Sequence, residues 1–294
     1  MSNRTESANP KHADLDLYSV ERLVEVLVDD QMEAFNAVRA CSGAIAQAVS
    51  AAVPRITSGG RLIYVGAGTS GRLGMLDSVE LYPTFSWPRE RAVALLAGGP
   101  TAMVESVEGA EDNEAHGAAD LIAIKPTTND VLLAIAASGR TPYVLGALRQ
   151  AKQAGALTIG FANNPDSLVA NEADIGVTLD TGAEVIGGST RLKAGTAQKI
   201  ALNSFSSALM VRMHKVYGNL MVDMRPSNVK LLRRAVLLTM QATGASEDKA
   251  LQTLESCAHQ VKLAIVCIKK DLDAETAAAL LARHAGSVRQ ALSS

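Results

Sequence analysis

RLIYVGAGTSGRLGML, residues 61–76, is the stretch that decides the fold of this chain. It opens with the apolar run Leu62–Val65, which is typical of a buried strand. A glycine-rich turn, 66–71, follows, and then a helical pattern that starts near Arg72. This order directs free backbone N–H groups and a helix N-terminus at one point, an arrangement that binds anions. Thr69 and Ser70 add two hydroxyl groups that can donate hydrogen bonds.

The same turn has the spacing GxGxxG, so a dinucleotide site has to be considered. Such a site needs an acidic residue about 20 residues later, at the end of the next strand, to bind a ribose. The next expected strand, Ala92–Leu96, runs into Ala97-Gly98-Gly99 without a carboxylate. A Walker A loop is excluded because no Gly-Lys-Ser/Thr follows. The turn favours a small ligand that carries phosphate, and a plain βα turn, the alternative, would not need the hydroxyls.

The composition of the 294 residues excludes several classes of protein. The net charge is −2 with both signs interspersed, which argues against nucleic acid or an anionic membrane as partner. No apolar run reaches the roughly 18 residues of a bilayer span, and the N-terminus lacks the apolar part of a secretory signal. Cys41, Cys257 and Cys267 show no metal spacing, and the histidines are scattered. We expect a cytoplasmic protein with buried thiols and no metal site.

Strands and helices alternate from residue 61 to about residue 164. Near-continuous apolar strands separated by helices are typical of an α/β fold with a parallel sheet covered on both faces. The further strands are expected at 92–96, 130–136, 157–161 and 173–179, and the intervening helices near 101–120 and 142–153.

Helical segments flank this region on both sides. Before it we expect a polar stretch over 1–18, a helix from a Ser19 cap to about residue 28 and a longer helix over 31–53. After the turn at Pro226-Ser227 the expected helices are 229–243, 246–257, 261–269, 273–282 and 287–293, with Asn228, Ser246, Asp273 and Ser287 as caps. The predicted division is a helical arm (1–54), an α/β domain (55–222) and a small all-helical module (223–294).

A second turn, Ala137-Ser138-Gly139-Arg140-Thr141, also lies between a buried strand and a helix. Two hydroxyl-bearing turns at the carboxyl ends of strands can converge on one crevice, which is where open α/β sheets bind ligands. Further on, Ser189 or Thr190 can cap a helix over 191–217. Arg191 and Lys193 then lie in its first turn, where the helix dipole disfavours cations, so they need a compensating anion unless they are solvated surface groups.

Two sets of carboxylates are candidates for proton transfer. In the first helix, Glu80 falls on the apolar stripe of Leu73, Leu76 and Val79. A carboxylate on a buried side has a raised pKa, which suits a proton donor at neutral pH. If the helix frays before Pro83, Glu80 is simply solvated.

The second set is a run of like charges: Glu105, Glu108, Glu111, Asp112 and Glu114. Most of such a run is ordinarily solvated. Gly109 interrupts the helix near 108–111, so one member can turn toward the crevice, and spacing does not choose between Glu108 and Glu111. Phosphate-binding turns with two carboxylates indicate isomerisation or elimination on a phosphorylated sugar.

At this point the motifs show a resemblance to a known family. YVGAGTSGRLGMLD and AIAASGRTPYV resemble the sugar isomerase (SIS) phosphosugar-binding family, and VEGAEDN, STRLKAGTAQK and VYGNLMVD resemble, within it, the N-acetylmuramic acid 6-phosphate etherases. The match runs from about Thr5 to the C-terminus. It implies a flavodoxin-like three-layer sandwich and a cytoplasmic, homodimeric lyase without a cofactor. The implied reaction cleaves a C3 D-lactyl ether to give N-acetylglucosamine 6-phosphate and D-lactate in peptidoglycan recycling.

The resemblance also implies roles for residues. Glu80 matches the acid that protonates the departing lactate, and Glu111, the second glutamate of EGAED, matches the base that removes the C2 proton. The residues that match substrate contacts are Gly68, Thr69, Ser70, Gly71, Arg72, Ser138, Gly139, Arg140, Thr141, Glu184, Ser189 and Lys193, of which Thr69, Ser70, Ser138 and Thr141 hold the phosphate and Lys193 faces an anionic substrate group.

One segment departs from the family pattern. The family usually reads like LDASECPPTF around the acid, whereas this chain reads LDSVELYPTF. Val79, Leu81 and Tyr82 therefore change the expected pocket shape. The C-terminal helices resemble a ubiquitin-associated-like bundle. A non-catalytic phosphosugar-binding regulator and an aldose–ketose isomerase are the competing functions.

Overall fold

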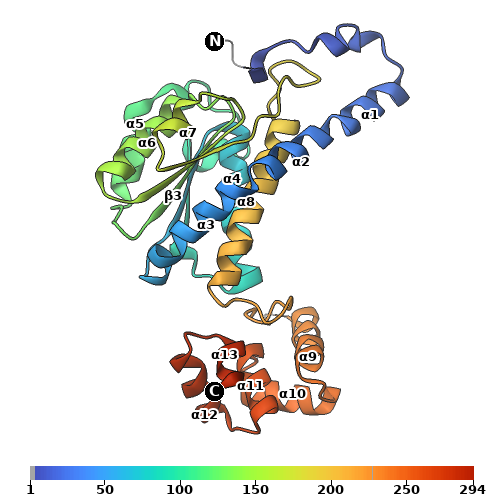
Figure 1. Cartoon of the computed structure of the whole chain (residues 1–294), viewed down its shortest axis with the longest axis vertical. Helices are drawn as coiled ribbons and strands as arrows, with labels where there is room; N and C mark the ends of the chain where they lie inside the picture. The colour runs from blue at the N-terminus through green and yellow to red at the C-terminus, as the bar shows by residue number, and fades with distance from the viewer. Residues whose placement is uncertain (1–3, 227) are drawn as a thin grey trace. The chain divides into compact units, whose positions relative to one another are not determined.

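The computed structural model describes residues 4–226 and 228–294, so the expectations for residues 1–3 and for Ser227 lie outside the described residues. The chain forms two compact units (Figure 1). The first comprises Met1–Val79 and Arg89–Ser207, and the second comprises Glu80–Pro88 and Ala208–Ser294. Helices α4 (Gly68–Phe85) and α8 (Lys193–Arg212) contribute residues to both units.

The described residues of the first unit contain one five-stranded parallel sheet, in the order β2-β1-β3-β4-β5. Its strands are β1 Leu62–Gly66, β2 Ala92–Leu96, β3 Val131–Ala136, β4 Leu157–Ala162 and β5 Ile175–Thr178. In the register of the central strand, Gly66 lies opposite Leu96 on one side and Ile135 on the other. The five expected strands are confirmed, and their ends differ from prediction by at most two residues.

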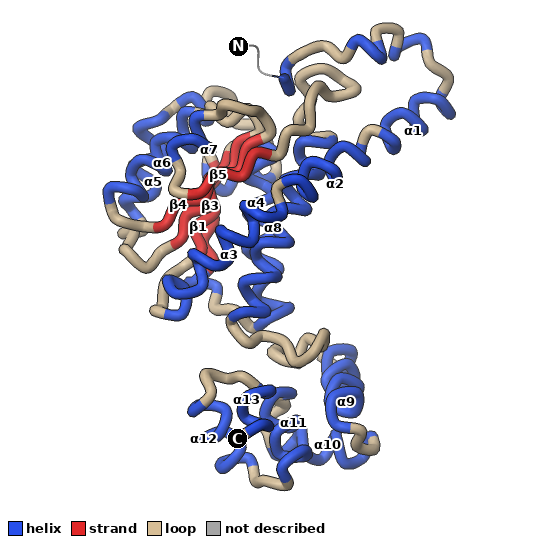
Figure 2. Tube along the Cα trace, viewed as in Figure 1, coloured by secondary structure: helices blue, strands red, loops and turns tan. Residues whose placement is uncertain are grey.

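Helices cover both faces of this sheet (Figure 2). One face carries α5 (Glu114–Ala123), α6 (Pro142–Gln153) and α7 (Leu168–Glu172), and the other carries α3 (Ser42–Thr57), α4 and α8. Ile63 and Leu132 are buried with Tyr143 under the first layer. On the other face the rings of Phe161 and Phe205 meet edge to face at 6.5 Å. The expected three-layer α/β sandwich is confirmed.

The segment after β2 is not the long helix that its sequence suggests. It holds two short turns, η5 (Gly99–Met103) and η6 (Ala110–Asp112), and α5 begins only at Glu114. Gly109 has φ +70°, a left-handed conformation that ends a helix. The expected helix over 101–120 is therefore wrong, whereas its interruption near residues 108–111 is confirmed.

The N-terminal segment is helical, with a different division from the expected one. Short turns η1 (Arg4–Glu6), η2 (Pro10–His12) and η3 (Leu15–Leu17) precede α1 (Val20–Asp29), α2 (Gln31–Ala40) and α3. Ser19 caps α1 as expected and accepts a 3.3 Å hydrogen bond from Arg22 N. The single helix over 31–53 is wrong, because the chain breaks at Cys41, whose thiol donates to the Thr178 carbonyl at 2.7 Å. Pro54 lies inside α3, where a proline near the end removes only one helical hydrogen bond.

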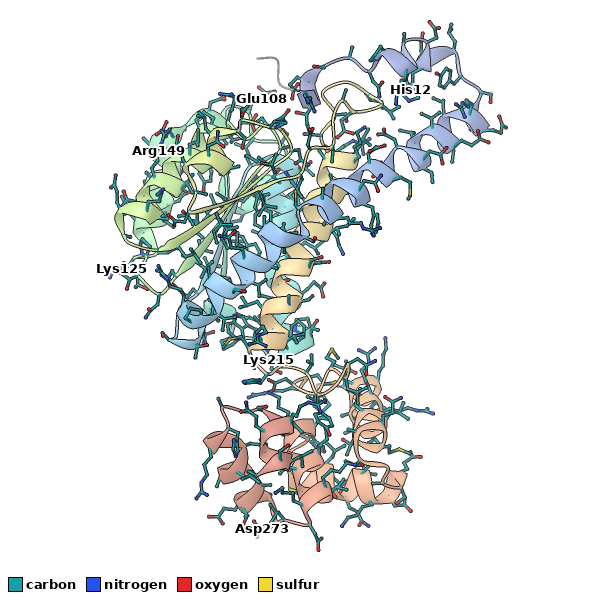
Figure 3. The ribbon with its side chains drawn as sticks, viewed as in Figure 1. His12, Glu108, Lys125, Arg149, Lys215 and Asp273 are labelled. Atoms are coloured by element: carbon teal, nitrogen blue, oxygen red, sulfur yellow. The ribbon has the colours of Figure 1, made fainter. Side chains whose placement is uncertain are left out.

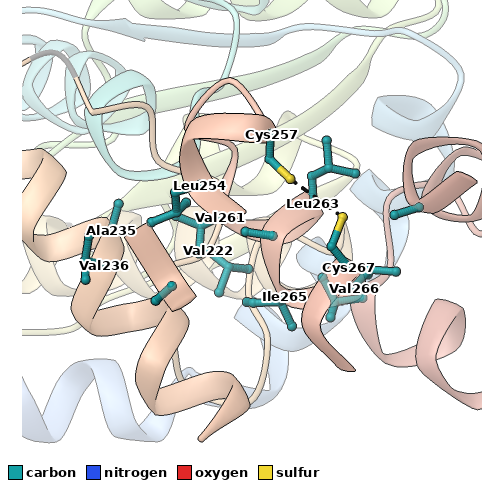
Figure 4. Packing of buried hydrophobic residues seen from close by; sticks show 14 of the residues in the cluster. Val222, Ala235, Val236, Leu254, Cys257, Val261, Leu263, Ile265, Val266 and Cys267 are labelled. Carbon is teal, nitrogen blue, oxygen red and sulfur yellow. Dashed lines mark hydrogen bonds between the residues drawn. The ribbon is translucent and has the colours of Figure 1, made fainter. Parts of the chain in front are cut away.

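The described residues 228–294 form a helical cluster with its own core. Its helices are α9 Val229–Thr243, α10 Glu247–Ser256, α11 Val261–Lys270, α12 Ala274–Arg283 and α13 Val288–Ser293. The four predicted caps are confirmed, and each side chain accepts a hydrogen bond from the N–H three residues on. Cys257 and Cys267 lie in the core with their sulfur atoms 3.6 Å apart (Figure 4), whereas Cys41 is only half-buried.

Candidate functional site

The sheet has one point at which the direction of its connections reverses. From β1 the chain passes through α4 on one face to β2, and from β3 it passes through α6 on the opposite face to β4. β1 and β3 are neighbours, so the crevice outside their carboxyl ends is the place where open α/β sheets bind ligands. The two turns that were predicted to converge, 66–71 and 137–141, follow these two strands. The topology places both turns at the same edge of the sheet.

The first turn is tighter than expected, because α4 begins at Gly68 and not near Arg72. A Cβ on Gly71 would lie 2.7 Å from the Gly66 carbonyl oxygen, so the helix can approach the strand end only with glycine there. Thr69 and the buried Ser70 lie in the first helical turn, whose N–H groups have no helical partner. This is a cradle of N–H and hydroxyl donors for an anion.

The second turn presents a similar set of donors at the start of α6. Ser138 Oγ lies 3.5 Å from Thr141 Oγ1 and accepts a 3.2 Å hydrogen bond from Arg140 N. Thr141 precedes α6 without capping it, so its hydroxyl is not used by the helix. Gly139 is buried, while the Arg140 side chain is exposed and donates to the Asp166 carbonyl at 3.4 Å.

Glu184 and Lys193, two of the predicted substrate contacts, both have defined partners within the first unit. Glu184 is fully buried, and its two carboxylate oxygens accept from Lys193 N at 3.2 Å and Ala194 N at 3.0 Å. It therefore caps α8, which begins too late for Ser189 or Thr190 to do so. Burial raises the pKa of Glu184 above its usual value, although the two N–H donors act in the opposite direction.

Lys193 has the compensating anion that the sequence requires. Its Nζ lies 2.7 Å from Asp30 Oδ1, and both side chains are nearly inaccessible. Asp30 Oδ2 and Thr181 Oγ1 have no hydrogen-bond partner within the described residues, and both line a pocket of about 520 Å³ beside Lys193. Arg191, the other cation expected in the first turn, is exposed and precedes the helix.

The expectation that Glu80 lies on a buried stripe is wrong for the single chain. Glu80 is exposed, as are Leu76 and Val79 at 47% and 61%. The side of α4 that faces the sheet is instead marked by Gly74, where an added Cβ would lie 3.2 Å from the Tyr64 side chain. α4 thus carries a second apolar stripe, and the stripe that contains Glu80 faces outward.

Sequence reasoning missed the carboxylate that α4 does bury, Asp77. It is 3% exposed and accepts hydrogen bonds from Tyr64 Oη at 2.8 Å, Ser206 Oγ at 3.1 Å and Asn203 Nδ2. Burial raises the pKa of Asp77, and these donors lower it by less. Asp77 comes three residues after Gly74, a helical spacing that puts both on the sheet-facing side, but the sequence does not show which side of α4 faces the sheet.

Glu111 lies in η6 and is exposed, and so is Glu108, which Figure 3 labels at the surface. Both belong to the segment that follows β2, so they stand at the same edge of the sheet as the first turn. Arg72 ties this segment to α4, because its guanidinium donates to the Ala102 carbonyl at 2.9 Å and the Glu105 carbonyl at 3.3 Å. The segment with the candidate base is therefore anchored to the helix that follows the first turn.

Within residues 4–226 and 228–294, no three His, Cys, Asp or Glu side chains are grouped as metal ligands would be. No helix in this part of the chain has both the length and the apolar character that a bilayer crossing requires.

Known proteins match this chain along its length. Residues 44–152 match the glucokinase regulatory protein N-terminal SIS domain, and residues 107–208 match the SIS domain. An N-acetylmuramic acid 6-phosphate etherase of Deinococcus radiodurans is 56% identical over 289 residues, covering 98% of this chain and 95% of the relative. The chain belongs to the N-acetylmuramic acid 6-phosphate etherase family.

Further relatives carry the same name, and etherases are enzymes. An etherase of Enterobacter sp. strain 638 is 49% identical over 288 residues, covering 98% of this chain and 97% of the relative. A crystal structure described as a phosphosugar isomerase involved in capsule formation, from Bacteroides fragilis, has a TM-score of 0.50 at 24% identity. The match covers 65% of this chain and 91% of the Bacteroides fragilis chain, and the two proteins share the fold. The resemblance stated from the motifs is confirmed.

Proposed function

We propose that this protein is an N-acetylmuramic acid 6-phosphate etherase, a carbon–oxygen lyase that acts in peptidoglycan recycling. Its substrate and water give N-acetylglucosamine 6-phosphate and D-lactate. The observation that carries the proposal is the pair of hydroxyl-bearing turns at the switch point of the sheet, in a chain that matches etherases over nearly its whole length. We keep the cytoplasm as its proposed location.

The phosphate end of the substrate is assigned to the two turns. Thr69 and Ser70 lie in the first turn of α4, and Ser138 and Thr141 lie just before α6. A phosphate between two helix N-termini is stabilised by both dipoles and by free N–H groups. In this assignment the turns take their shape from Gly68, Gly71 and Gly139. They are held in place by Arg72 and Arg140. The sugar end of the substrate is surrounded by Glu184, Ser189 and Lys193.

The chemistry begins from the ring-opened aldehyde form of the sugar. Its C2 proton is acidic because it lies α to the carbonyl, and Glu111 accepts it. The electron pair of the broken C2–H bond forms a C2=C3 double bond, the C3–O bond to lactate breaks, and Glu80 protonates the departing oxygen. Water then adds at C3 and gives a proton to the Glu80 carboxylate, while the Glu111 carboxyl group returns its proton to C2. The C3 hydroxyl is formed, Glu80 is again protonated and Glu111 is again a carboxylate.

A second copy of the chain is proposed as the partner. Large apolar side chains are exposed at a spacing of three or four residues along α1 and α2: Val20, Val24, Val28, Met32 and Phe35. Such a stripe on two successive helices is typical of an interface. A copy that also covered Leu76 and Val79 would take the neighbouring Glu80 out of water. We keep the arm (1–54), SIS domain (55–222) and helical module (223–294) as the proposed division.

The test is D-lactate release from N-acetylmuramic acid 6-phosphate by purified protein. In deuterated water, Glu111→Gln should stop both lactate release and C2 proton exchange, whereas Glu80→Gln should stop release but retain some exchange. Glu108→Gln is the matched control and should leave both unchanged. No lactate from the unaltered protein would refute the function. Full activity of both the Glu80 and Glu111 variants would refute only the carboxylate assignment.

A further inference from the structure

The second unit contains a pocket that the proposed reaction does not use. Its volume is about 350 Å³, large enough for a small ligand. Segment 222–225 and helices α11 and α12 supply most of its lining. The charged residues that line it are Lys215, Arg225 and Lys262 against the single carboxylate of Asp223, so three positive charges face one negative charge.

The two lysines share one carboxylate oxygen. Lys215 Nζ and Lys262 Nζ lie 2.7 Å and 2.8 Å from Asp223 Oδ2. Burial lowers the pKa of Lys262 and the charge of Lys215 lowers it further, although Asp223 acts in the opposite direction. Arg225 is exposed and has no ion pair within the described part of the chain. The single carboxylate of Asp223 therefore does not neutralise the positive charge of the three cations in this pocket.

Neighbouring groups keep these charges together. Lys215 Nζ, labelled in Figure 3, lies 5.7 Å from the centroid of the Trp87 ring, which orients the ammonium group. A Cβ added to Gly286 would lie 3.7 Å from Lys262 Nζ, so the pocket wall beside that ammonium is bare backbone. Burial and the nearby charges of Lys262 and Arg212 lower the pKa of His214, which is consistent with a positive local potential.

Backbone donors add to the same pocket. The Gln260 side chain makes no capping hydrogen bond to α11, and the first helical bond runs from Ala264 N to Gln260 O. The N–H groups of Val261, Lys262 and Leu263, all pocket residues, therefore have no helical acceptor. Lys262 lies in this first turn, where the dipole disfavours a cation unless an anion is close.

We propose that this pocket binds a phosphate dianion, either as inorganic phosphate or as the phosphate group of a small monoester. The site is separate from the two turns at the sheet, and it gives the C-terminal helices a ligand of their own. Two lysines and an arginine supply charge, and helix α11 supplies N–H donors, which together match the needs of a tetrahedral oxyanion. The inference stands whether or not the chain is an etherase.

The test uses the full-length, isotopically labelled protein and follows its amide resonances. Inorganic phosphate and, in a separate arm, glucose 6-phosphate are added at constant ionic strength, with sodium chloride as the reference. We expect saturable shifts at Val261, Lys262 and Leu263, which report this pocket apart from the sheet site. Tighter binding in one arm identifies the preferred source of the phosphate.

Matched variants separate binding from structure. Lys262→Gln leaves Asp223 paired with Lys215, and we expect phosphate affinity to fall at least tenfold while the protein stays folded. Lys269→Gln, at the exposed other end of α11, should bind as the unaltered protein does. Arg225→Gln, at an exposed position, gives a second variant that should also weaken binding.

Two results would overturn the proposal. One is an equal response to sodium chloride and to phosphate, or no saturable shift at the start of α11. The other is that Lys262→Gln lowers thermal stability to the same extent with and without phosphate, which would make the lysines and Asp223 a purely structural ion-pair network.

Discussion

Gly71→Ala is the substitution that most sharply tests how the first turn, which we propose binds the substrate phosphate, is built. An added Cβ would lie 2.7 Å from the Gly66 carbonyl oxygen and 2.3 Å from Leu96 Cδ1. Leu96 can change rotamer, but the carbonyl belongs to β1 and cannot. Since close carbon–oxygen contacts start near 3.3 Å, α4 would have to move by about 0.6 Å.

The expected cost follows from that displacement. Overpacking of a well-packed site costs about 1–3 kcal/mol, and a conflict with backbone favours the upper end. For a protein of this size, 3 kcal/mol corresponds to a fall of roughly 6–12 °C in Tm. The same movement displaces the N–H groups of the turn, and because misplacements of about 1 Å cost about a hundredfold, we expect roughly a tenfold rise in KM for the phosphosugar.

Gly43→Ala is the matched control. Gly43 lies near the start of α3, and no atom lies within 4 Å of an added Cβ. Alanine there should leave Tm unchanged or raise it slightly, because glycine is the weaker helix former by up to about 1 kcal/mol. Thermal unfolding followed by circular dichroism, and lactate release against substrate concentration, measure both effects. A Gly71→Ala protein with the Tm and KM of the unaltered chain would refute the close-approach argument.

Two further predictions concern stability and thiol reactivity. Asp130 is 1% exposed, and although burial would raise its pKa, hydrogen bonds from Arg61 and the Thr127 N–H hold it below the usual value. Asp130→Asn should cost about 3 kcal/mol in urea unfolding at pH 7. The difference in free energy of unfolding between the two proteins should shrink as the pH falls below about 4 and then through the lower pKa that Asp130 has in the folded state. A difference that does not change with pH would contradict the lowered pKa of Asp130. Cys257 and Cys267 are both buried, and burial raises the pKa of the Cys267 thiol to about 12. Because buried thiols are out of reach of a reagent, both should react with iodoacetamide at pH 8 only after unfolding, and rapid labelling of the native protein seen by mass spectrometry would contradict this.

The sequence predicts best where the deciding interactions are local. The strands follow from short apolar runs, and helix caps such as Ser246 and Asp273 act on N–H groups only three residues away. Strands and caps of this kind need no knowledge of distant contacts. The two hydroxyl-bearing turns can also be recognised locally, but that they follow neighbouring strands is known only from the sheet order.

Prediction from the sequence fails where a residue distant in the chain determines which way a side chain points or which partner it has. α4 has two apolar stripes, and the choice between Glu80 and Asp77 as the inward carboxylate depends on Tyr64 and Asn203, which are 13 and 126 residues from Asp77. The cap of α8 comes from Glu184, and the anion for Lys193 comes from Asp30, 163 residues away. Local spacing carries no information about such pairs.

The most direct test of the central claim is the fate of the ether oxygen when the reaction runs in ¹⁸O-labelled water. Elimination followed by hydration breaks the C3–O bond, so lactate keeps the ether oxygen and water supplies the new hydroxyl. The account predicts unlabelled D-lactate and one ¹⁸O at C3 of N-acetylglucosamine 6-phosphate. Label in the lactate hydroxyl, with none at C3, would contradict it.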